Sequence, residues 1–240
     1  MNMLRQLIVN ADDFGQSHGI NRGVIEAYEK GIVTSASLMV RGPAAEEAAG
    51  YARKHPDLSL GLHLDLCEWI CRDDKWEPLY EVVAAHDADA IKQEVARQLD
   101  TFKRLVGHEP THLDSHQHVH RSEPVRSIMV ETAGRLAVPL RDFSDQVKYC
   151  GRFYGQGANG YPYPEGISVP GLLDCLRSLP AGVTELGCHP GWPGDLTSMY
   201  TTERLTELKV LCDPAIRAAI DEEEIRLSSF LNLAPAPVAV

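Results

Sequence analysis

The chain has 240 residues, of which 44% are hydrophobic and 24% are charged, and these ordinary values exclude a mostly disordered protein. Its formal net charge is −11, and lysine and arginine are scattered along the sequence, so a nucleic acid backbone would be repelled on average. No apolar stretch approaches the roughly 20 residues that cross a bilayer. We therefore expect neither a nucleic acid nor a membrane as a partner.

The six cysteines form no CxxC pair, and the first residues lack the apolar region and cleavage site of a secretory signal. These features predict reduced thiols and a cytoplasmic location. The size is compatible with one domain, so we expect a single domain over residues 1–240 with a frayed tail at 234–240.

Apolar runs rich in β-forming residues alternate with segments of helical periodicity. In chain order, strands are predicted at residues 4–10, 32–40, 58–64, 111–115, 138–143, 182–189 and 225–230. Helices are predicted between them and after them, at residues 20–31, 43–55, 88–106, 123–136, 169–179, 202–211 and 214–223. Such alternation is typical of an α/β protein in which β/α units build a parallel, barrel-like sheet.

Two long stretches, residues 65–87 and 144–167, do not fit this alternation. Loops of that length inside a compact domain usually act as lids or binding loops. We therefore predict that both stretches face a substrate.

Acidic residues and histidines stand where four predicted strands end. They are Asp12 and Asp13 after the first strand, His63 at the end of the third, Asp114 and His116 at the end of the fourth, and His189 at the end of the sixth. Because the carboxyl ends of parallel strands share one face of a barrel, we expect these side chains to converge at a catalytic mouth.

Taken singly, these residues also have simpler explanations. Asp12 and Asp13 are typical of a helix cap or a turn, and His63 of a buried core histidine. Residues 112–120 differ, because they hold four histidines, which a stable apolar core does not need. Two neutral imidazoles with one carboxylate suit zinc or another divalent metal and leave positions open for water and substrate. His189 is predicted to donate a proton, although a turn-stabilising role beside Pro190 fits its sequence equally well.

The sequence resembles that of the YdjC-like carbohydrate deacetylases, which include the chitooligosaccharide deacetylases. The resemblance spans nearly the whole chain, in LIVNADDFGQSHGIN, GIVTSASLMV, GLHLDL, PTHLDSHQHVH, GCHPG and the carboxyl-terminal LTELKVLCDPAIRAAI and IRLSSF. It implies a distorted (β/α) barrel of the TIM-like kind, a divalent metal ion, and removal of acetyl groups from N-acetylated sugars. It also implies a homodimer.

Carried over to this chain, the resemblance implies that Asp13, His63 and His116 hold the metal, which is expected to be magnesium or zinc. Asp12 then corresponds to the catalytic base. His189 corresponds to an acid or a transition-state stabiliser.

The chain departs from many relatives at Gln117, where they have a histidine. Because Gln117 is not assigned to the metal, we expect metal binding to survive this change. Asp114, His118 and Trp192 are expected around the metal or against the substrate. Several aromatic side chains of the presumed loops could stack on sugar rings or simply pack the loops: Trp69, Trp76, Tyr161, Tyr163 and Trp192.

Three other functions remain open at this stage. His112 and Asp114 with a later histidine imitate the two-histidine, one-carboxylate set of an Fe(II) oxygenase, for which a β-rich jelly roll is expected. Another metal-dependent hydrolase, a phosphoesterase or an amidase, is a second alternative. A non-catalytic sugar- or metal-binding protein on an enzyme-like scaffold is the third, and the spare carboxylate of Asp12 beside Asp13 argues against it.

Overall fold

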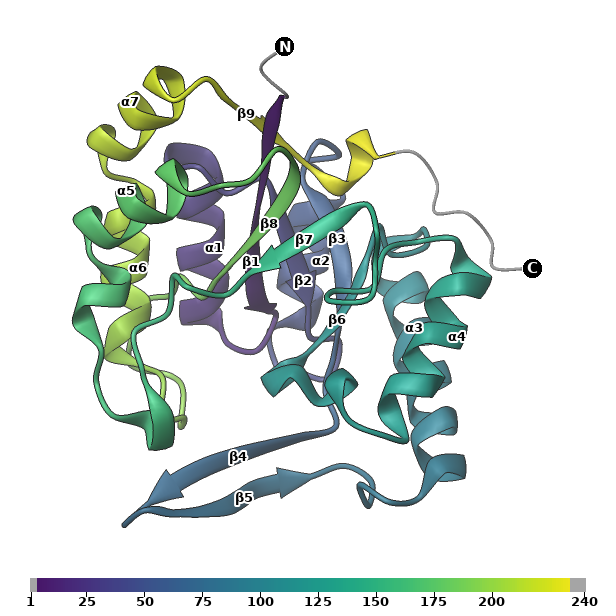
Figure 1. The fold of residues 1–240 in the computed structure, drawn as a ribbon. Coiled ribbons are helices and arrows are strands. Elements are labelled where there is room, and N and C mark those ends of the chain that lie inside the picture. The colour runs from purple at the N-terminus through teal and green to yellow at the C-terminus, as the bar shows by residue number, and fades with distance from the viewer. Residues whose placement is uncertain (1–3, 234–240) are drawn as a thin grey trace.

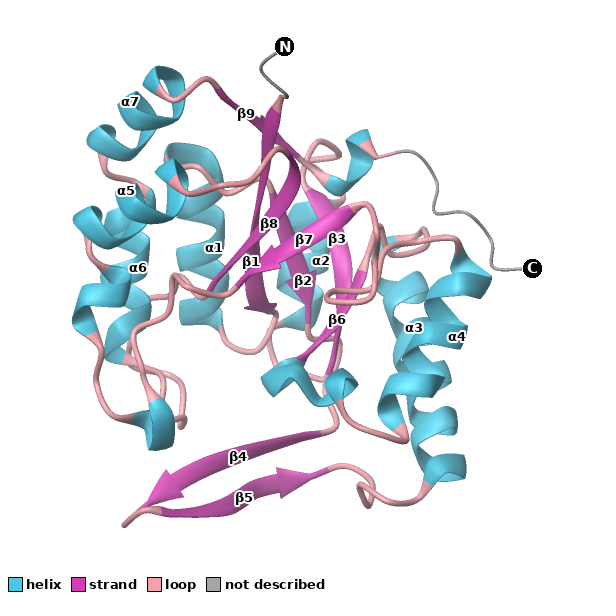
Figure 2. Cartoon of the chain, in the orientation of Figure 1, coloured by secondary structure: helices cyan, strands magenta, loops and turns pink. Residues whose placement is uncertain are grey.

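The computed structural model describes residues 4–233 and is built on a seven-stranded sheet (Figures 1 and 2). The strands of this sheet are β1 (Arg5–Phe14), β2 (Ser35–Leu38), β3 (Ser59–Leu64), β6 (Leu113–Ser115), β7 (Val147–Cys150), β8 (Gly182–Cys188) and β9 (Ile225–Ser228). Their order is β6-β3-β2-β1-β8-β7, every pairing is parallel, and β9 pairs with β1.

The strands are parallel because helices return the chain to the same end of the sheet. These helices are α1 (His18–Lys30), α2 (Ala45–Ala52), α3 (Ala88–Val106), α4 (Val125–Leu136), α5 (Val169–Arg177), α6 (Thr202–Leu211) and α7 (Pro214–Glu222). In Figure 1, α5, α6 and α7 lie on one flank of the sheet beyond α1, and α3 and α4 lie on the other. Strands β2 and β3 are buried along their whole length, as expected when both faces of a parallel sheet are covered.

The predicted alternation of strands and helices is confirmed, and with it the distorted barrel class, because the parallel sheet curls into a half-barrel. Helix α3 has the predicted bounds. Its start is fixed by Asp87, whose side chain accepts a hydrogen bond from the Ala90 N–H, and its end by Gly107 at a φ of 96°. The jelly roll that the oxygenase alternative requires is not the fold of the described residues.

The strand predicted at residues 138–143 is wrong. Among the described residues this segment makes only a single parallel bridge, between Leu113 and Leu140. Pro139 offers no N–H to a ladder, and Asp142 turns the chain with a φ of 66°. The outer strand is instead β7, which pairs with β8 and lies inside the stretch predicted as a loop.

The other predicted loop, residues 65–87, contains an antiparallel hairpin of β4 (Cys67–Arg72) and β5 (Lys75–Glu81). Its turn residues Asp73 and Asp74 both have positive φ, 49° and 60°, as a two-residue hairpin turn requires. Figure 1 shows the hairpin beyond the carboxyl ends of the parallel strands.

The predicted tail at 234–240 lies outside the described residues. None of the helices in residues 4–233 combines the length and the hydropathy that a membrane crossing requires.

Candidate active site

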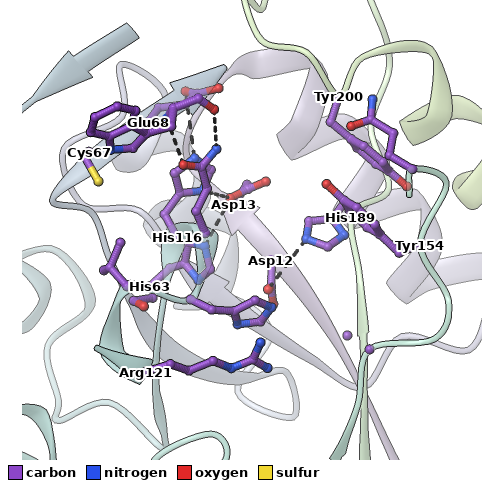
Figure 3. Close-up of a pocket in the computed structure, with 18 of the residues that line it drawn as sticks. Asp12, Asp13, His63, Cys67, Glu68, His116, Arg121, Tyr154, His189 and Tyr200 are labelled. Atoms are coloured by element: carbon purple, nitrogen blue, oxygen red, sulfur yellow. Dashed lines mark hydrogen bonds and ion pairs between the residues drawn. The ribbon is translucent and has the colours of Figure 1, made fainter. Parts of the chain in front are cut away.

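A cavity of about 930 Å³ opens at the carboxyl ends of the parallel strands. It is lined by all five residues singled out as metal ligands or catalytic groups, namely Asp12, Asp13, His63, His116 and His189. Figure 3 shows Asp13 and His116 on the side of the hairpin residues Cys67 and Glu68, whereas His189 faces them from the side of Tyr154 and Tyr200. The expected convergence of these side chains is therefore found in the structure.

Asp13, His63 and His116 form a compact group of possible metal ligands. Asp13 Oδ1 lies 2.9 Å from His116 Nδ1 and 3.2 Å from His63 Nε2. One ligand atom from each residue lies within 4.8 Å of the other two, and all three residues are buried. Two imidazole nitrogens and one carboxylate oxygen are a donor set that suits a divalent metal ion with open positions. The residues present therefore fit such an ion.

The two adjacent aspartates reach the same cavity because β1 ends irregularly. In a regular strand, neighbouring side chains point to opposite faces. Here the pairing of β1 with β2 shifts register between Ala11 and Phe14, and Asp13 has a φ of 65°. This local distortion lets both Asp12 and Asp13 line the cavity.

His63 is oriented by Asp114, which is its direct partner in the register of β3 and β6. The Nδ1–H of His63 donates to Asp114 Oδ1 over 2.7 Å, which leaves Nε2 facing Asp13. Metal-bound histidines usually have such a carboxylate partner. Burial disfavours a charge on the ring, but the carboxylates of Asp114, Asp13 and Asp12 raise the pKa of His63 to about 10. The carboxylates around the His63 ring therefore favour a positive charge at this position.

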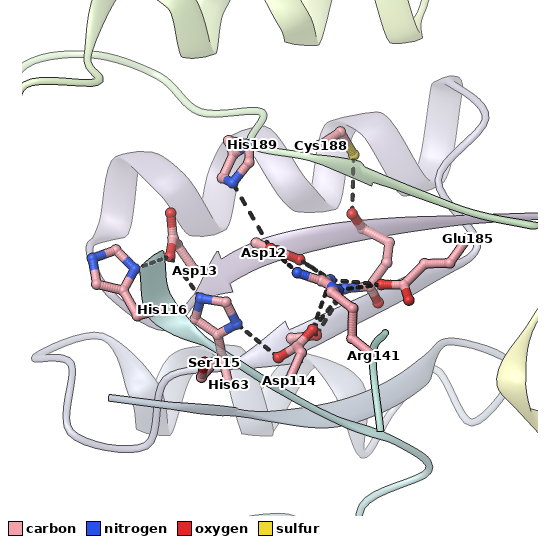
Figure 4. A network of polar contacts seen from close by, with 12 residues as sticks. Asp12, Asp13, His63, Asp114, Ser115, His116, Arg141, Glu185, Cys188 and His189 are labelled. Carbon is pink, nitrogen blue, oxygen red and sulfur yellow. Dashed lines mark hydrogen bonds and ion pairs between the residues drawn. The ribbon is translucent and has the colours of Figure 1, made fainter. Parts of the chain in front are cut away.

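Arg141 is the centre of a buried charge network that the sequence did not reveal (Figure 4). Its guanidinium donates to both carboxylate oxygens of Asp12, at 2.6 and 2.7 Å, and lies 2.7 Å from Asp114 Oδ2 and 2.6 Å from Glu185 Oε1. Burial alone would raise the pKa of Asp12, but Arg141 outweighs it and holds that pKa below its usual value. Burial raises the pKa of Glu185 to about 7 despite Arg141.

Helix α6 contributes two buried charged residues that sequence reasoning also missed. Arg204 donates to Asp13 Oδ2 over 2.7 Å, and it counters the effect of burial so that the pKa of Asp13 lies well below its usual value. Glu207, which is fully buried, accepts the backbone N–H of His189 over 2.5 Å and lies 3.8 Å from His189 Nδ1. Burial lowers the pKa of His189, but Glu207 more than compensates and the pKa is raised.

His189 and Asp12 lie close together, with Nε2 of the ring 3.8 Å from Asp12 Oδ2 (Figure 4). His118 also lines the cavity but belongs to a different group, in which one ligand atom each from His118, His120 and Asp142 lies within 4.8 Å of the others. The chain separates His118 from His116 because Gln117 and His118 both have positive φ, 48° and 54°.

The expectation that Trp192 lies against the metal or the substrate needs correction. Its backbone N–H donates to Gly19 O over 2.9 Å, so the segment after His189 crosses α1. The indole then lies on the outer side of that helix, where its N–H donates to Glu26 and the Arg22 guanidinium stacks 5.9 Å from the ring centre. Trp192 is not part of the cavity wall that the described residues form.

Comparison with known proteins was made by sequence and by structure. The model of a family described as YdjC-like protein matches residues 6–222. A carbohydrate deacetylase of Geobacillus stearothermophilus is 32% identical in an alignment of 249 positions, which covers 95% of this chain and 98% of that protein. A chitooligosaccharide deacetylase of Salmonella paratyphi B is 33% identical in an alignment of 258 positions, which covers 96% of this chain and 100% of that protein.

Among solved structures, one from Enterococcus faecalis, described as a cellobiose-phosphate cleavage protein, superposes with a TM-score of 0.76 at 24% identity. The match covers 96% of this chain and 99% of that one. At this level of identity, the likeness shows that the two proteins share a fold.

Proposed function

The chain belongs to the YdjC-like family, and from this premise we propose that it is a carbohydrate deacetylase, a hydrolase that uses one divalent metal ion to remove the acetyl group of an N-acetylated sugar. The observation that carries the proposal is the position of Asp12 and His189, which lie next to each other in the same cavity as the Asp13, His63 and His116 group. A base and an acid close to a metal position can together catalyse the hydrolysis of an amide.

The base in this proposal is Asp12. A divalent ion held by Asp13, His63 and His116 would polarise the acetyl carbonyl and make a bound water more acidic. The two hydrogen bonds from Arg141 fix the orientation of the Asp12 carboxylate and keep it ionised, so it is ready to accept the proton of the attacking water.

The acid is His189. Breaking the C–N bond releases acetate and a sugar amine, and the amine must gain a proton as it leaves. Glu207 favours the protonated imidazole and holds the loop at the His189 backbone N–H. Tyr200, which donates its hydroxyl to Glu207, fixes that carboxylate in turn. These contacts therefore favour the charged form of His189 and fix its position for this proton transfer.

The proposed cofactor is one magnesium or zinc ion, and the proposed unit of function is the whole chain as one domain. We further propose a cytoplasmic location, which the six free thiols support, since disulfides are rare in that compartment. A homodimer is proposed from the family resemblance, and sedimentation of the purified protein tests it.

Acetate release tests the proposed function. The purified protein is incubated with N-acetylated mono- and oligosaccharides after treatment with a chelator, and then with added zinc, magnesium or cobalt. We expect acetate release from at least one sugar, its loss after chelation, and its recovery with about one equivalent of metal. No acetate from any sugar with any of these metals would refute the proposal.

A further inference from the structure

The β4–β5 hairpin is a part of the cavity wall that the proposed chemistry does not use. It lies beyond the ends of the parallel strands (Figure 1). Side-chain hydrogen bonds join it to the rest of the molecule at both of its ends. At its base, Tyr80 donates to Asp65 over 2.8 Å. At its tip, Tyr161 donates to Asp74 over 2.8 Å, so the hairpin is tied to the loop that follows β7.

Two tryptophans stand on one face of this hairpin. Cross-strand partners share a face of an antiparallel pair, and so do residues two apart on one strand. Trp76 is paired with Cys71, and Cys71 follows Trp69 by two residues. Trp69 and Trp76 are therefore diagonal neighbours on the same face, and both line the cavity that holds Asp13 and His116.

The exposure of these rings argues against a role in the core. Trp76 is 50% exposed, and Trp69 is half-buried. Although exposed, Trp76 is held in place, because its indole N–H donates to Asn159 Oδ1 over 3.3 Å. An exposed aromatic ring fixed at the wall of a polar cavity is suited to bind the apolar C–H face of a sugar ring.

The hairpin is also attached directly to the turn that carries His116. The side chain of Gln117 accepts the backbone N–H of Trp69 over 2.8 Å and donates to the Trp69 carbonyl over 2.7 Å. The Gln117 side chain thus bonds both the N–H and the carbonyl of Trp69, as the backbone of a neighbouring strand would. The residue beside a proposed metal ligand thus sets the distance between the metal group and the tryptophan face.

We propose that Trp69 and Trp76 form the subsite that binds the second sugar ring of an N-acetylated oligosaccharide. The inference rests on the proposed function for the identity of the sugar. The cavity volume of about 930 Å³ supports it, because ligand pockets span roughly 300–1,000 Å³ and this one is near the upper end. One ring placed at Asp12 and His189 leaves the hairpin side of the cavity for the next.

Steady-state kinetics with N,N′-diacetylchitobiose test the subsite. We expect Trp76→Ala to raise KM about tenfold, which equals about 1.4 kcal/mol, with kcat within about threefold of the unchanged protein. Trp192→Ala is the matched control, since it removes an indole of similar exposure, 39%, outside the cavity, and both constants should stay within about twofold. Thermal unfolding of both variants confirms that they are folded.

Calorimetric binding of the same disaccharide to Asp12→Asn, with and without Trp76→Ala, separates this inference from the proposed function. About tenfold weaker binding with the second substitution supports the subsite. If the unchanged protein releases acetate but Trp76→Ala behaves like Trp192→Ala, the subsite is wrong and the function stands. If no acetate is released but Trp76→Ala still weakens binding, the function is wrong and the subsite stands. No binding at all would overturn both.

Discussion

The two walls of the cavity are stabilised in opposite ways. The inner wall, at the strand ends, consists of buried charges that neutralise one another around Arg141 and Arg204. The outer wall, formed by the β4–β5 hairpin and the loop after β7, exposes the rings of Trp76 and Tyr161. Hydrogen bonds between exposed side chains join its two parts at Asn159 and Asp74, and Gln117 joins the hairpin to the turn after β6. The groups that we propose to act on protons are thus buried among paired charges, whereas those that we propose to bind a sugar lie on a hairpin outside the parallel sheet.

This difference predicts large effects from changes at the inner wall and small ones at the outer wall. The largest is expected for Asp12→Asn, which removes the proposed base but leaves the three proposed metal ligands in place. The value of kcat should fall by about two to four powers of ten, the usual contribution of a general base. Rate measurements with elemental analysis of bound metal check it. Unchanged turnover would remove Asp12 from the mechanism.

The next effect is on stability. Arg141→Met leaves Asp12, Asp114 and Glu185 buried without their shared cation, and we expect a loss of about 3–5 kcal/mol in the free energy of unfolding. Arg121→Met is the matched control, because Arg121 pairs with Asp142 at the surface, where such a pair contributes about 0–1 kcal/mol. Urea unfolding of both variants measures the difference, and equal losses would mean that the network does not stabilise the site.

The smallest effect is expected at the outer wall, for Gln117→Ala. Losing both hydrogen bonds to Trp69 frees the hairpin from the metal-bearing turn, and we expect KM for the disaccharide to rise about three- to tenfold. Gln117→Glu should fall between the two proteins, since its carboxylate can accept the Trp69 N–H but cannot donate to the carbonyl. A fall in kcat at constant KM would instead place Gln117 in the chemistry.

Much of the framework could be predicted because it depends on local patterns. Helix α3 was predicted with its observed bounds, since an apolar stripe, an Asp cap and a terminal glycine act within one segment. The convergence of Asp12, Asp13, His63, His116 and His189 was also predicted, because the carboxyl ends of parallel strands share one edge. The missed strand β7 and the hairpin have short, weakly patterned sequences, and their pairing partners decide them.

The sequence by itself determined the α/β alternation and the chemical types gathered at the strand ends, because apolar periodicity and strand direction can be read locally. Only the tertiary structure decided which charged residues complete the site. Arg204 and Glu207 lie on a helix whose sequence is typical of a solvated surface, yet both are buried, and Arg204 pairs with Asp13 from 191 positions away. A buried charge is stable only beside a group of opposite charge. Here the two partners come from distant segments of the chain, so they meet only when those segments pack together.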